Sequence, residues 1–169
     1  APGALAARLG GALQLRVLGG FQADNALCAA VAAAAAGFEP AAIREGIAAF
    51  AGVPGRFQVC ARDPLVVVDF AHSPDALERV LAGARALAAP RGGRLGCVFG
   101  CGGERDRTKR KEMGAIADRL ADAVWLTTDN PRGEPAEAIA AMVLAGVPSD
   151  PVARRAAWCE QPDRRAAIA

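Results

Sequence analysis

Three short apolar segments recur along the chain, and each is followed by a polar loop and then by a stretch with helical spacing. They occupy residues 65–68, 94–99 and 123–127. Such strand–helix alternation predicts β–α–β units with right-handed crossovers and a parallel sheet. The first segment is Leu-Val-Val-Val, which is typical of a parallel strand buried on both faces. We therefore predict an α/β domain with a doubly wound, mostly parallel sheet.

Helix signals fill the intervals between these segments. Ser73-Pro74 is expected to open a helix over 75–89, because proline favours the first helical turn. A charged stretch leads into a second helix with an apolar side, and a third covers 134–145. The apolar side of the second helix consists of Met113, Ile116, Ala117 and Leu120. The tail at 151–169 begins a further strand–helix unit.

The region before residue 53 has a different pattern. Alternating apolar residues at 13–18 predict a strand. Asp24 is expected to cap a helix over 25–36, and Pro40 to start a second helix that reaches Phe50. The pattern then breaks at Gly52-Val53-Pro54-Gly55. We predict three parts: a region at 1–52, a linker at 53–63 and the α/β domain at 64–169.

Composition excludes several classes of protein. With 53% hydrophobic and 22% charged residues the chain is not intrinsically disordered. Aromatic residues make up 5%, too few for a platform that stacks nucleic-acid bases. A net charge of +2 is too small to hold DNA or a membrane surface. No uncharged apolar run reaches the ~18 residues of a membrane span. From these observations together we predict neither nucleic-acid binding nor membrane insertion.

Five cysteines without a Cys-x-x-Cys pair argue against both a disulfide framework and a structural zinc site. We expect reduced thiols in a cytoplasmic protein and no metal site in this chain. The first residues, Ala-Pro-Gly-Ala-Leu, contain neither a methionine nor a signal-peptide layout. We therefore expect the chain to be part of a longer protein.

Polar residues follow each predicted strand, at the edge where open α/β sheets bind ligands. Asp69 directly follows the first strand, and its carboxylate can accept ribose hydroxyls or cap the next turn. His72 is the only histidine, and it can contact a phosphate or the reacting centre, or serve as a capping residue. Arg56, near the predicted linker, can reach a nucleotide in an inter-domain cleft or be a surface charge.

The loop Gly100-Cys101-Gly102-Gly103 permits close backbone approach, but it is neither a Walker A loop nor a Gly-x-Gly-x-x-Gly motif. A basic run follows it, and most of that run is expected to be a solvated helix entrance. Arg105, nearest the glycines, is the exception and can meet an anionic ligand. The run consists of Arg105, Arg107, Lys109, Arg110 and Lys111.

The segment Asp129-Asn130-Pro131-Arg132 is the most specific local motif. Pro131 fixes its own φ and restricts Asn130 to extended geometry, so Asn130 and Arg132 can project towards one ligand. The planar fork of Arg132 suits a carboxylate. A plain turn is the alternative, since Asn-Pro often marks one.

In combination these motifs resemble the Mur ligases of bacterial cell-wall synthesis, and among them the members that add meso-diaminopimelate. The resemblance covers nearly the whole chain. The matching segments are Gly55-Arg56-Phe57, VVVDFAHSPDAL at 66–77, CVFGCGGERDR at 97–107, MGAIA at 113–117, TDNPR at 128–132 and GFQADN at 20–25.

The resemblance implies a Rossmann-like C-terminal domain, truncated here, at 64–169, preceded by the helical tail of the central ATP-binding domain at 1–52. It also implies three residue roles. A recognition loop, assisted by Arg105, binds meso-diaminopimelate; other residues line the nucleotide side of the cleft; and a histidine is catalytic. The recognition loop consists of Asp129, Asn130, Pro131 and Arg132, the nucleotide side of Arg56 and Asp69, and the catalytic residue is His72.

The implied reaction is ATP-dependent amide-bond formation in peptidoglycan precursor synthesis. ATP phosphorylates the glutamyl carboxylate of a UDP-muramyl dipeptide, the amine of meso-diaminopimelate attacks, and phosphate leaves. ATP and Mg²⁺ are expected to bind mainly to the central domain, whose phosphate loop is not in this sequence. We therefore expect a monomeric cytoplasmic ligase, and no ligase activity from this chain alone.

Two alternatives stay open at this point. A related ligase such as folylpolyglutamate synthetase shares the Asp-x-Ala-His loop seen at 69–72, although the TDNPR segment argues against it. A non-catalytic binding module on the same fold is the other alternative, because fold does not fix function.

Overall fold

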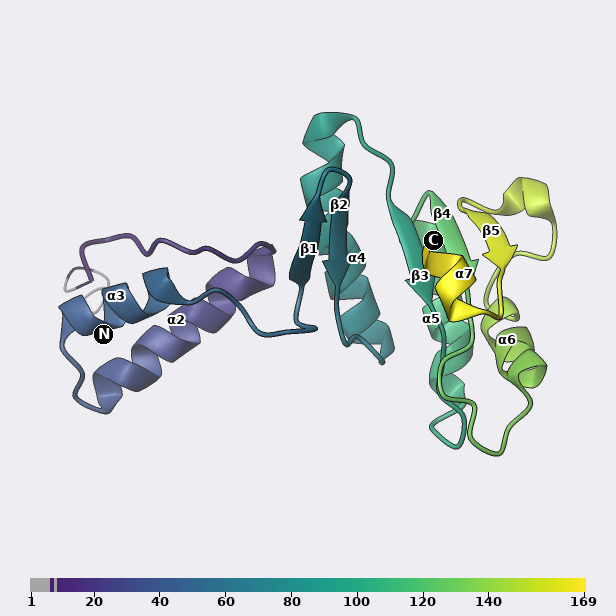
Figure 1. Ribbon diagram of the computed structural model, residues 1–169, viewed down its shortest axis with the longest axis horizontal. Helices are drawn as coiled ribbons and strands as arrows, with labels where there is room; N and C mark the ends of the chain where they lie inside the picture. The colour runs from purple at the N-terminus through teal and green to yellow at the C-terminus, as the bar shows by residue number, and fades with distance from the viewer. Residues whose placement is uncertain (1–6, 8) are drawn as a thin grey trace. The chain divides into compact units, whose positions relative to one another are not determined.

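The computed structural model describes residue 7 and residues 9–169 (Figure 1). The chain forms two compact units that divide between Phe70 and Ala71. The first residues of the predicted 1–52 region, including the Ala-Pro-Gly-Ala-Leu start, lie outside the described part. No helix among the described residues is long and apolar enough to cross a membrane.

Two helices form most of the first unit: α2, Gly20–Ala35, and α3, Pro40–Ala49. Helix α3 begins at Pro40 as predicted. Helix α2 begins at Gly20, four residues before Asp24, and its N-cap residue is Gly19, with φ 99°. The capping role predicted for Asp24 is therefore wrong. A small apolar cluster holds the two helices together. Its buried members are Leu9, Ala30 and Ile43.

The strand predicted over residues 13–18 is wrong. These residues have no regular secondary structure, and the sheets of the described chain contain no partner for them. A strand is stable only when a neighbouring strand takes its backbone hydrogen bonds, so apolar alternation alone does not form one.

A hairpin ends the first unit. Strand β1, Gln58–Arg62, pairs antiparallel with β2, Leu65–Val68. The prediction of a parallel strand buried on both faces is therefore wrong for β2. Alternate side chains of β2 face outward, and Val66 and Val68 are 42% and 47% exposed. The apolar run identified a strand, but it could not identify which strand would pair with it.

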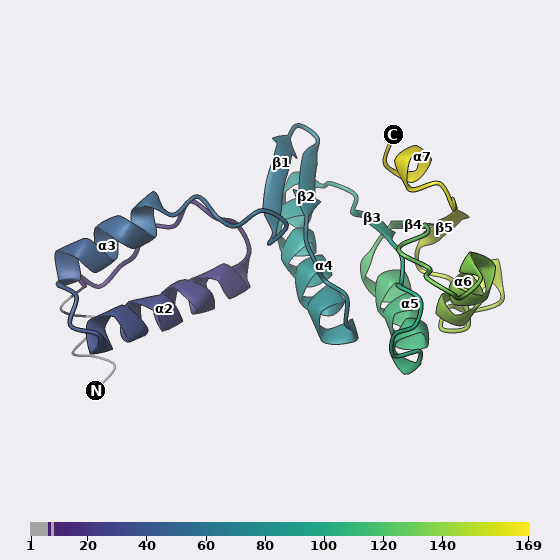
Figure 2. The same ribbon diagram turned by 60° about the horizontal axis from the view of Figure 1, so that its bottom comes forward.

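The second unit contains a parallel sheet in the order β3-β4-β5. Its strands are Gly96–Phe99, Ala123–Leu126 and Ala157–Glu160. The prediction of an α/β fold with a parallel sheet is confirmed. Its helices are α4, Pro74–Ala88; α5, Thr108–Leu120; α6, Ala136–Leu144; and α7, Arg164–Ile168, with short 3₁₀ turns η1, Ala89–Arg91, and η2, Pro151–Ala153. Helices α5 and α6 lie on one side of the sheet and α7 on the other (Figure 2).

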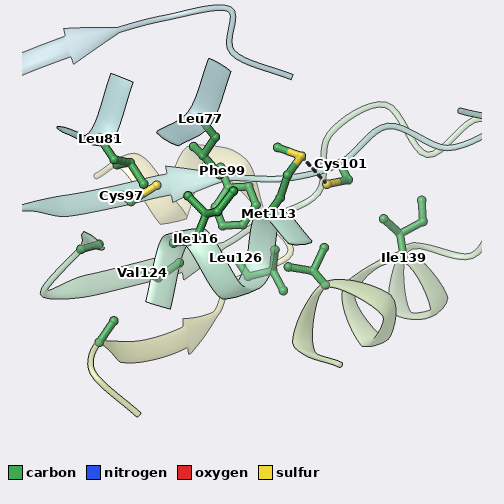
Figure 3. Packing of buried hydrophobic residues seen from close by; sticks show 14 residues of the cluster. Leu77, Leu81, Cys97, Phe99, Cys101, Met113, Ile116, Val124, Leu126 and Ile139 are labelled. Carbon is green, nitrogen blue, oxygen red and sulfur yellow. Dashed lines mark hydrogen bonds between the residues drawn. The ribbon is translucent and has the colours of Figure 1, made fainter. Parts of the chain in front are cut away.

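The core of this unit lies between the sheet and its helices (Figure 3). Met113, Ile116 and Ala117 are buried there, as the apolar side of α5 predicted. Two glycines let α5 and α6 pack unusually closely. A Cβ atom on Gly114 would lie 2.1 Å from the Val143 carbonyl oxygen, and one on Gly146 would lie 1.8 Å from that of Lys111. The end of α6 is thereby fixed against the start of α5.

Candidate functional site

Two loops meet at the carboxyl ends of β3 and β4. We call residues 100–107 the glycine loop. From here on, the name recognition loop covers residues 127–134, which include the predicted segment 129–132. The Gly103 N–H donates to the Asn130 carbonyl at 2.8 Å, and Arg132 Nη1 donates to the Gly103 carbonyl at 2.6 Å. A Cβ atom on Gly100 would lie 2.1 Å from the Thr127 carbonyl oxygen, so the backbones run side by side. The loops therefore form one surface at the ligand-binding edge of the sheet.

Arg132 is exposed and lies on this surface in a strained conformation. Its φ of 50° is left-handed, which a residue with a side chain rarely adopts outside functional sites. Carbonyl oxygens of Gly103 and Asn130 hold one end of its guanidinium, at 2.6 and 3.5 Å. No carboxylate of the described chain pairs with Arg132 or with the exposed Arg105 of the glycine loop. The arrangement leaves their charges available to an anionic ligand.

The carboxyl end of β5 also reaches this surface. The Thr128 N–H and the Thr127 hydroxyl both donate to the Pro162 carbonyl, which follows β5, at 3.3 Å. Arg164, the first residue of α7, donates to the Thr128 carbonyl at 3.2 Å and lies 3.7 Å from the Asp129 carboxylate. Asp129 is therefore partly neutralised by a cation of the same domain.

A buried ion pair lies beneath the two loops, and the sequence analysis missed it. Arg110 was predicted to be solvated, yet its side chain is 0% exposed. It donates to both carboxylate oxygens of Glu134 at 2.9 Å and to the Gly102 carbonyl at 3.1 Å. One signal was present in the sequence: Arg110 lies three and seven residues before Met113 and Ala117, on the apolar side of α5.

Glu134 has two further partners, a backbone N–H donor and a second arginine. Besides Arg110, it accepts the Glu104 N–H at 2.6 Å and lies 3.2 Å from Arg107. Hydrogen bonds from Arg110, followed by that from the Glu104 backbone, lower the pKa of Glu134 to about 2. The hydrogen bonds that Arg110 donates to Glu134 also raise the pKa of Arg110. Both groups are therefore charged at neutral pH.

His72 lies in the loop that precedes α4, and its side chain is exposed. Lys109, at the start of α5, donates to the His72 carbonyl at 2.6 Å. This hydrogen bond places the His72 loop beside the end of the glycine loop. Its catalytic role stays a prediction.

Arg56 and Asp69 belong to the first unit. The Arg56 guanidinium stacks on the Phe70 ring, 5.2 Å from its centroid, and the Asp69 carboxylate accepts the Phe57 N–H at 2.8 Å. Asp69 thus helps to hold Phe57, whose φ of 47° is left-handed. Arg16, Arg56 and Arg62 line a cavity of about 460 Å³, and guanidinium groups are well suited to phosphate. The nucleotide roles predicted for Arg56 and Asp69 stay predictions.

A second cavity, of about 170 Å³, borders the recognition loop. Leu126, Ile139 and Leu144 give it a mostly apolar wall, and neither arginine nor lysine is among its lining residues in the described chain. A carboxylate would find no cation there. The role of Arg132 and Arg105 in recognising a carboxylate stays a prediction.

The described residues form no metal centre, and two of the five cysteines, Cys97 and Cys101, are buried. The described residues contain no group of three side chains suited to holding a metal ion, so the residues present do not fit Mg²⁺. Burial raises the pKa of Cys97 to about 12, and it also raises the pKa of Cys101, whose sulfur lies 3.9 Å from that of Met113 (Figure 3). Both thiols stay protonated at neutral pH, which leaves them poor nucleophiles.

Comparison with known proteins extends this picture. The chain is 52% identical over 153 residues to the UDP-N-acetylmuramoyl-L-alanyl-D-glutamate–2,6-diaminopimelate ligase of Streptomyces avermitilis, covering 89% of the chain and 30% of that relative. A solved structure of a ligase with the same name matches with a TM-score of 0.62 and 42% identity, over 92% of this chain and 31% of that one. The chain thus spans less than a third of the length of these relatives.

A more distant likeness shows the fold alone. Folylpolyglutamate synthase of Mycobacterium tuberculosis, solved with ADP, matches with a TM-score of 0.67 at 23% identity, covering 92% of this chain and 33% of that one.

Residues 55–169 match the family described as Mur ligase, glutamate ligase domain. The chain therefore belongs to the Mur ligase family, as its strand-end motifs predicted.

Proposed function

We propose that this chain supplies the amino-acid recognition surface of an ATP-dependent ligase that adds meso-diaminopimelate to UDP-N-acetylmuramoyl-L-alanyl-D-glutamate. One observation carries the proposal: the recognition loop presents Arg132, unpaired by any carboxylate of the described chain, at the ligand-binding edge of the sheet. The name of the Streptomyces avermitilis relative contains the same two substrates and supports this assignment.

The chemistry of the amino acid explains the choice of residues. Meso-diaminopimelate carries a second amino-acid group that lysine lacks. Arg132 and Arg105 can bind its distal carboxylate, because a guanidinium offers paired donors in a plane. Asn130 can serve either the distal carboxylate or the distal ammonium through its amide. When the distal end of meso-diaminopimelate is held in this way, its other amino group points towards the glutamyl carboxylate with which it forms the amide bond.

ATP, bound mainly by parts of the ligase outside this chain, supplies the phosphoryl group that activates the glutamyl carboxylate. The amine then attacks the acyl phosphate, a C–N bond forms, the C–O bond to phosphate breaks, and inorganic phosphate leaves. Arg56 would hold nucleotide phosphate in its arginine-lined cavity. We assign His72 to the reacting side because its loop lies beside the glycine loop. No step is assigned to Mg²⁺, and cytoplasmic location and a monomeric state belong to the same proposal.

A substrate comparison tests the proposal. A full-length protein containing this chain is incubated with ATP, the UDP-muramyl dipeptide and either meso-diaminopimelate or L-lysine. Phosphate release and product mass are measured. We expect turnover with meso-diaminopimelate and a kcat/KM for lysine lower by at least a hundredfold, because lysine has no distal carboxylate for Arg132 and Arg105 to bind. Equal use of the two amino acids, or no ligase turnover at all, would refute the assignment.

A further inference from the structure

The Arg110–Glu134 pair sits where the two ligand-facing loops meet, yet neither residue reaches the ligand-binding surface. Arg110 is fully buried, and the Glu134 side chain is 9% exposed. The pair joins three pieces of chain: α5, the glycine loop through Gly102 and Glu104, and the recognition loop through Glu134 itself. These contacts add to the direct hydrogen bonds between the two loops, from the Gly103 N–H to the Asn130 carbonyl and from Arg132 to the Gly103 carbonyl.

Stability alone does not account for such a pair. Two charges removed from water lose their hydration, and their mutual attraction only roughly offsets that loss. Apolar residues of similar size often stabilise a core equally well. The Arg110 Nε–H is also buried without a partner among the described residues, a defect that an apolar side chain would not carry. What the ion pair provides and apolar residues do not is directional geometry, since a bidentate bond fixes distance and plane together.

We propose that Arg110 and Glu134 are positioning residues for amino-acid recognition, which set the separation and orientation of the glycine loop and the recognition loop. This inference rests on the proposed function. Glu134 lies two residues after Arg132, so its fixed carboxylate anchors the end of the loop that carries the guanidinium. Glu104, held through its N–H to Glu134, directly precedes Arg105. Both candidate carboxylate-binding arginines are thereby tied to one buried anion.

The opposite edge of the sheet offers a matched control. Arg85 pairs with Asp122 at 2.9 Å, and the Asp122 carboxylate also accepts the Leu95 N–H at 2.6 Å. This pair has the same charged groups, with side chains about a third exposed, and it joins the residues that precede β3 and β4, at the amino ends of the strands. It therefore stabilises the same sheet at the edge that faces away from the proposed ligand.

The test compares two double variants in the full-length ligase that contains this chain: Arg110→Met with Glu134→Leu, and Arg85→Met with Asp122→Leu. Steady-state kinetics give KM for each substrate and kcat. For the Arg110–Glu134 variant we expect KM for the amino acid to rise at least tenfold, with KM for ATP and for the UDP-muramyl dipeptide within twofold. Its kcat at saturating amino acid should stay within about threefold. The Arg85–Asp122 variant should keep KM for the amino acid within twofold.

Two single variants complete the experiment. Glu134→Gln keeps the shape and the acceptor for the Glu104 N–H, and Arg110→Lys keeps the charge but not the fork. Both should raise KM for the amino acid by less than the double variant does. An unchanged KM in the Arg110–Glu134 double variant, or an equal rise in the Arg85–Asp122 variant, would overturn the proposal. So would failure of both the double variant and Glu134→Gln to fold, because the pair would then serve the fold itself.

The outcome stays distinct from that of the proposed function. Should the wild-type ligase prefer another amino acid, the substrate assignment fails, and the same KM comparison is made with the amino acid that it accepts. The positioning role is then tested by comparing the change in KM for that amino acid between the two double variants.

Discussion

The backbone of Gly103 runs so close to Pro131 that a Cβ atom at position 103 would lie 1.8 Å from the Pro131 carbonyl oxygen. No side chain fits into that gap, so Gly103→Ala must push the glycine loop and the recognition loop apart. We expect a loss of about 1–3 kcal/mol in the free energy of unfolding, as for other overpacked sites, and a higher KM for the amino acid. Urea unfolding and steady-state kinetics measure the two effects.

Gly46→Ala is the control for this change. Gly46 lies inside α3, and a Cβ atom there would meet no atom within 4 Å. Alanine should be neutral or stabilising at that position by up to about 1 kcal/mol. Equal stability of Gly103→Ala and wild type would show that the loops can separate without consequence.

Replacing Arg132 should affect amino-acid use most. Arg132→Ala removes a charge-assisted contact worth on the order of 2–4 kcal/mol in transition-state stabilisation, so kcat/KM for meso-diaminopimelate should fall roughly 30-fold or more. Arg91→Ala serves as control, because Arg91 is likewise exposed and donates to a backbone carbonyl, that of Leu87. Wild-type kcat/KM in the Arg132 variant would remove Arg132 from the recognition site.

The stability of the second unit should depend on acid through Glu134. Its pKa is about 2 in the folded protein, against an ordinary value of 4.5. Between these values the unfolded chain binds the proton more readily, so unfolding is favoured as the pH falls. The contribution is complete above pH 4.5 and is lost as the pH falls through about 2.

Urea unfolding between pH 6 and pH 3 measures this dependence in wild type and in Glu134→Gln. The wild type should lose stability more steeply than the variant over this range, because glutamine has no proton to bind. Subtraction of the two curves removes the carboxylates that they share, including Asp122, whose pKa Arg85 lowers. Parallel curves would contradict the prediction.

Asp118 should hold β5 to the rest of the sheet. This buried carboxylate accepts the Arg155 and Ala156 N–H groups at 3.2 and 3.3 Å and the Trp158 indole N–H at 2.9 Å. Asp118→Ala leaves these donors without their acceptor, so we expect a loss of about 3 kcal/mol in the free energy of unfolding. Thermal unfolding followed by circular dichroism measures it.

Glu78→Ala is the matched control, since the Glu78 carboxylate pairs with Arg119 where both side chains are about half exposed. Such a surface pair contributes about 1 kcal/mol or less. If the two variants unfolded at the same temperature, the three hydrogen bonds to Asp118 would carry no special weight.

Local patterns predicted the second unit well. Ser73 accepts the Ala76 N–H and Pro74 occupies the first turn of α4, as expected for residues whose preferences act over one helical turn. The apolar side of α5 is buried for the same reason: its spacing is a property of the helix itself. The polar residues that end β3 and β4 also lie at one edge of the sheet, which follows from parallel strands.

The sequence by itself determined these elements and the chemical character of the strand ends, because propensity, capping and periodicity depend on near neighbours in the chain. Only the tertiary structure decided that β2 pairs with β1, that residues 13–18 form no strand, and that Arg110 is buried against Glu134. Each of these depends on a partner distant in sequence, and a residue's own pattern carries no record of which partner will remove it from water.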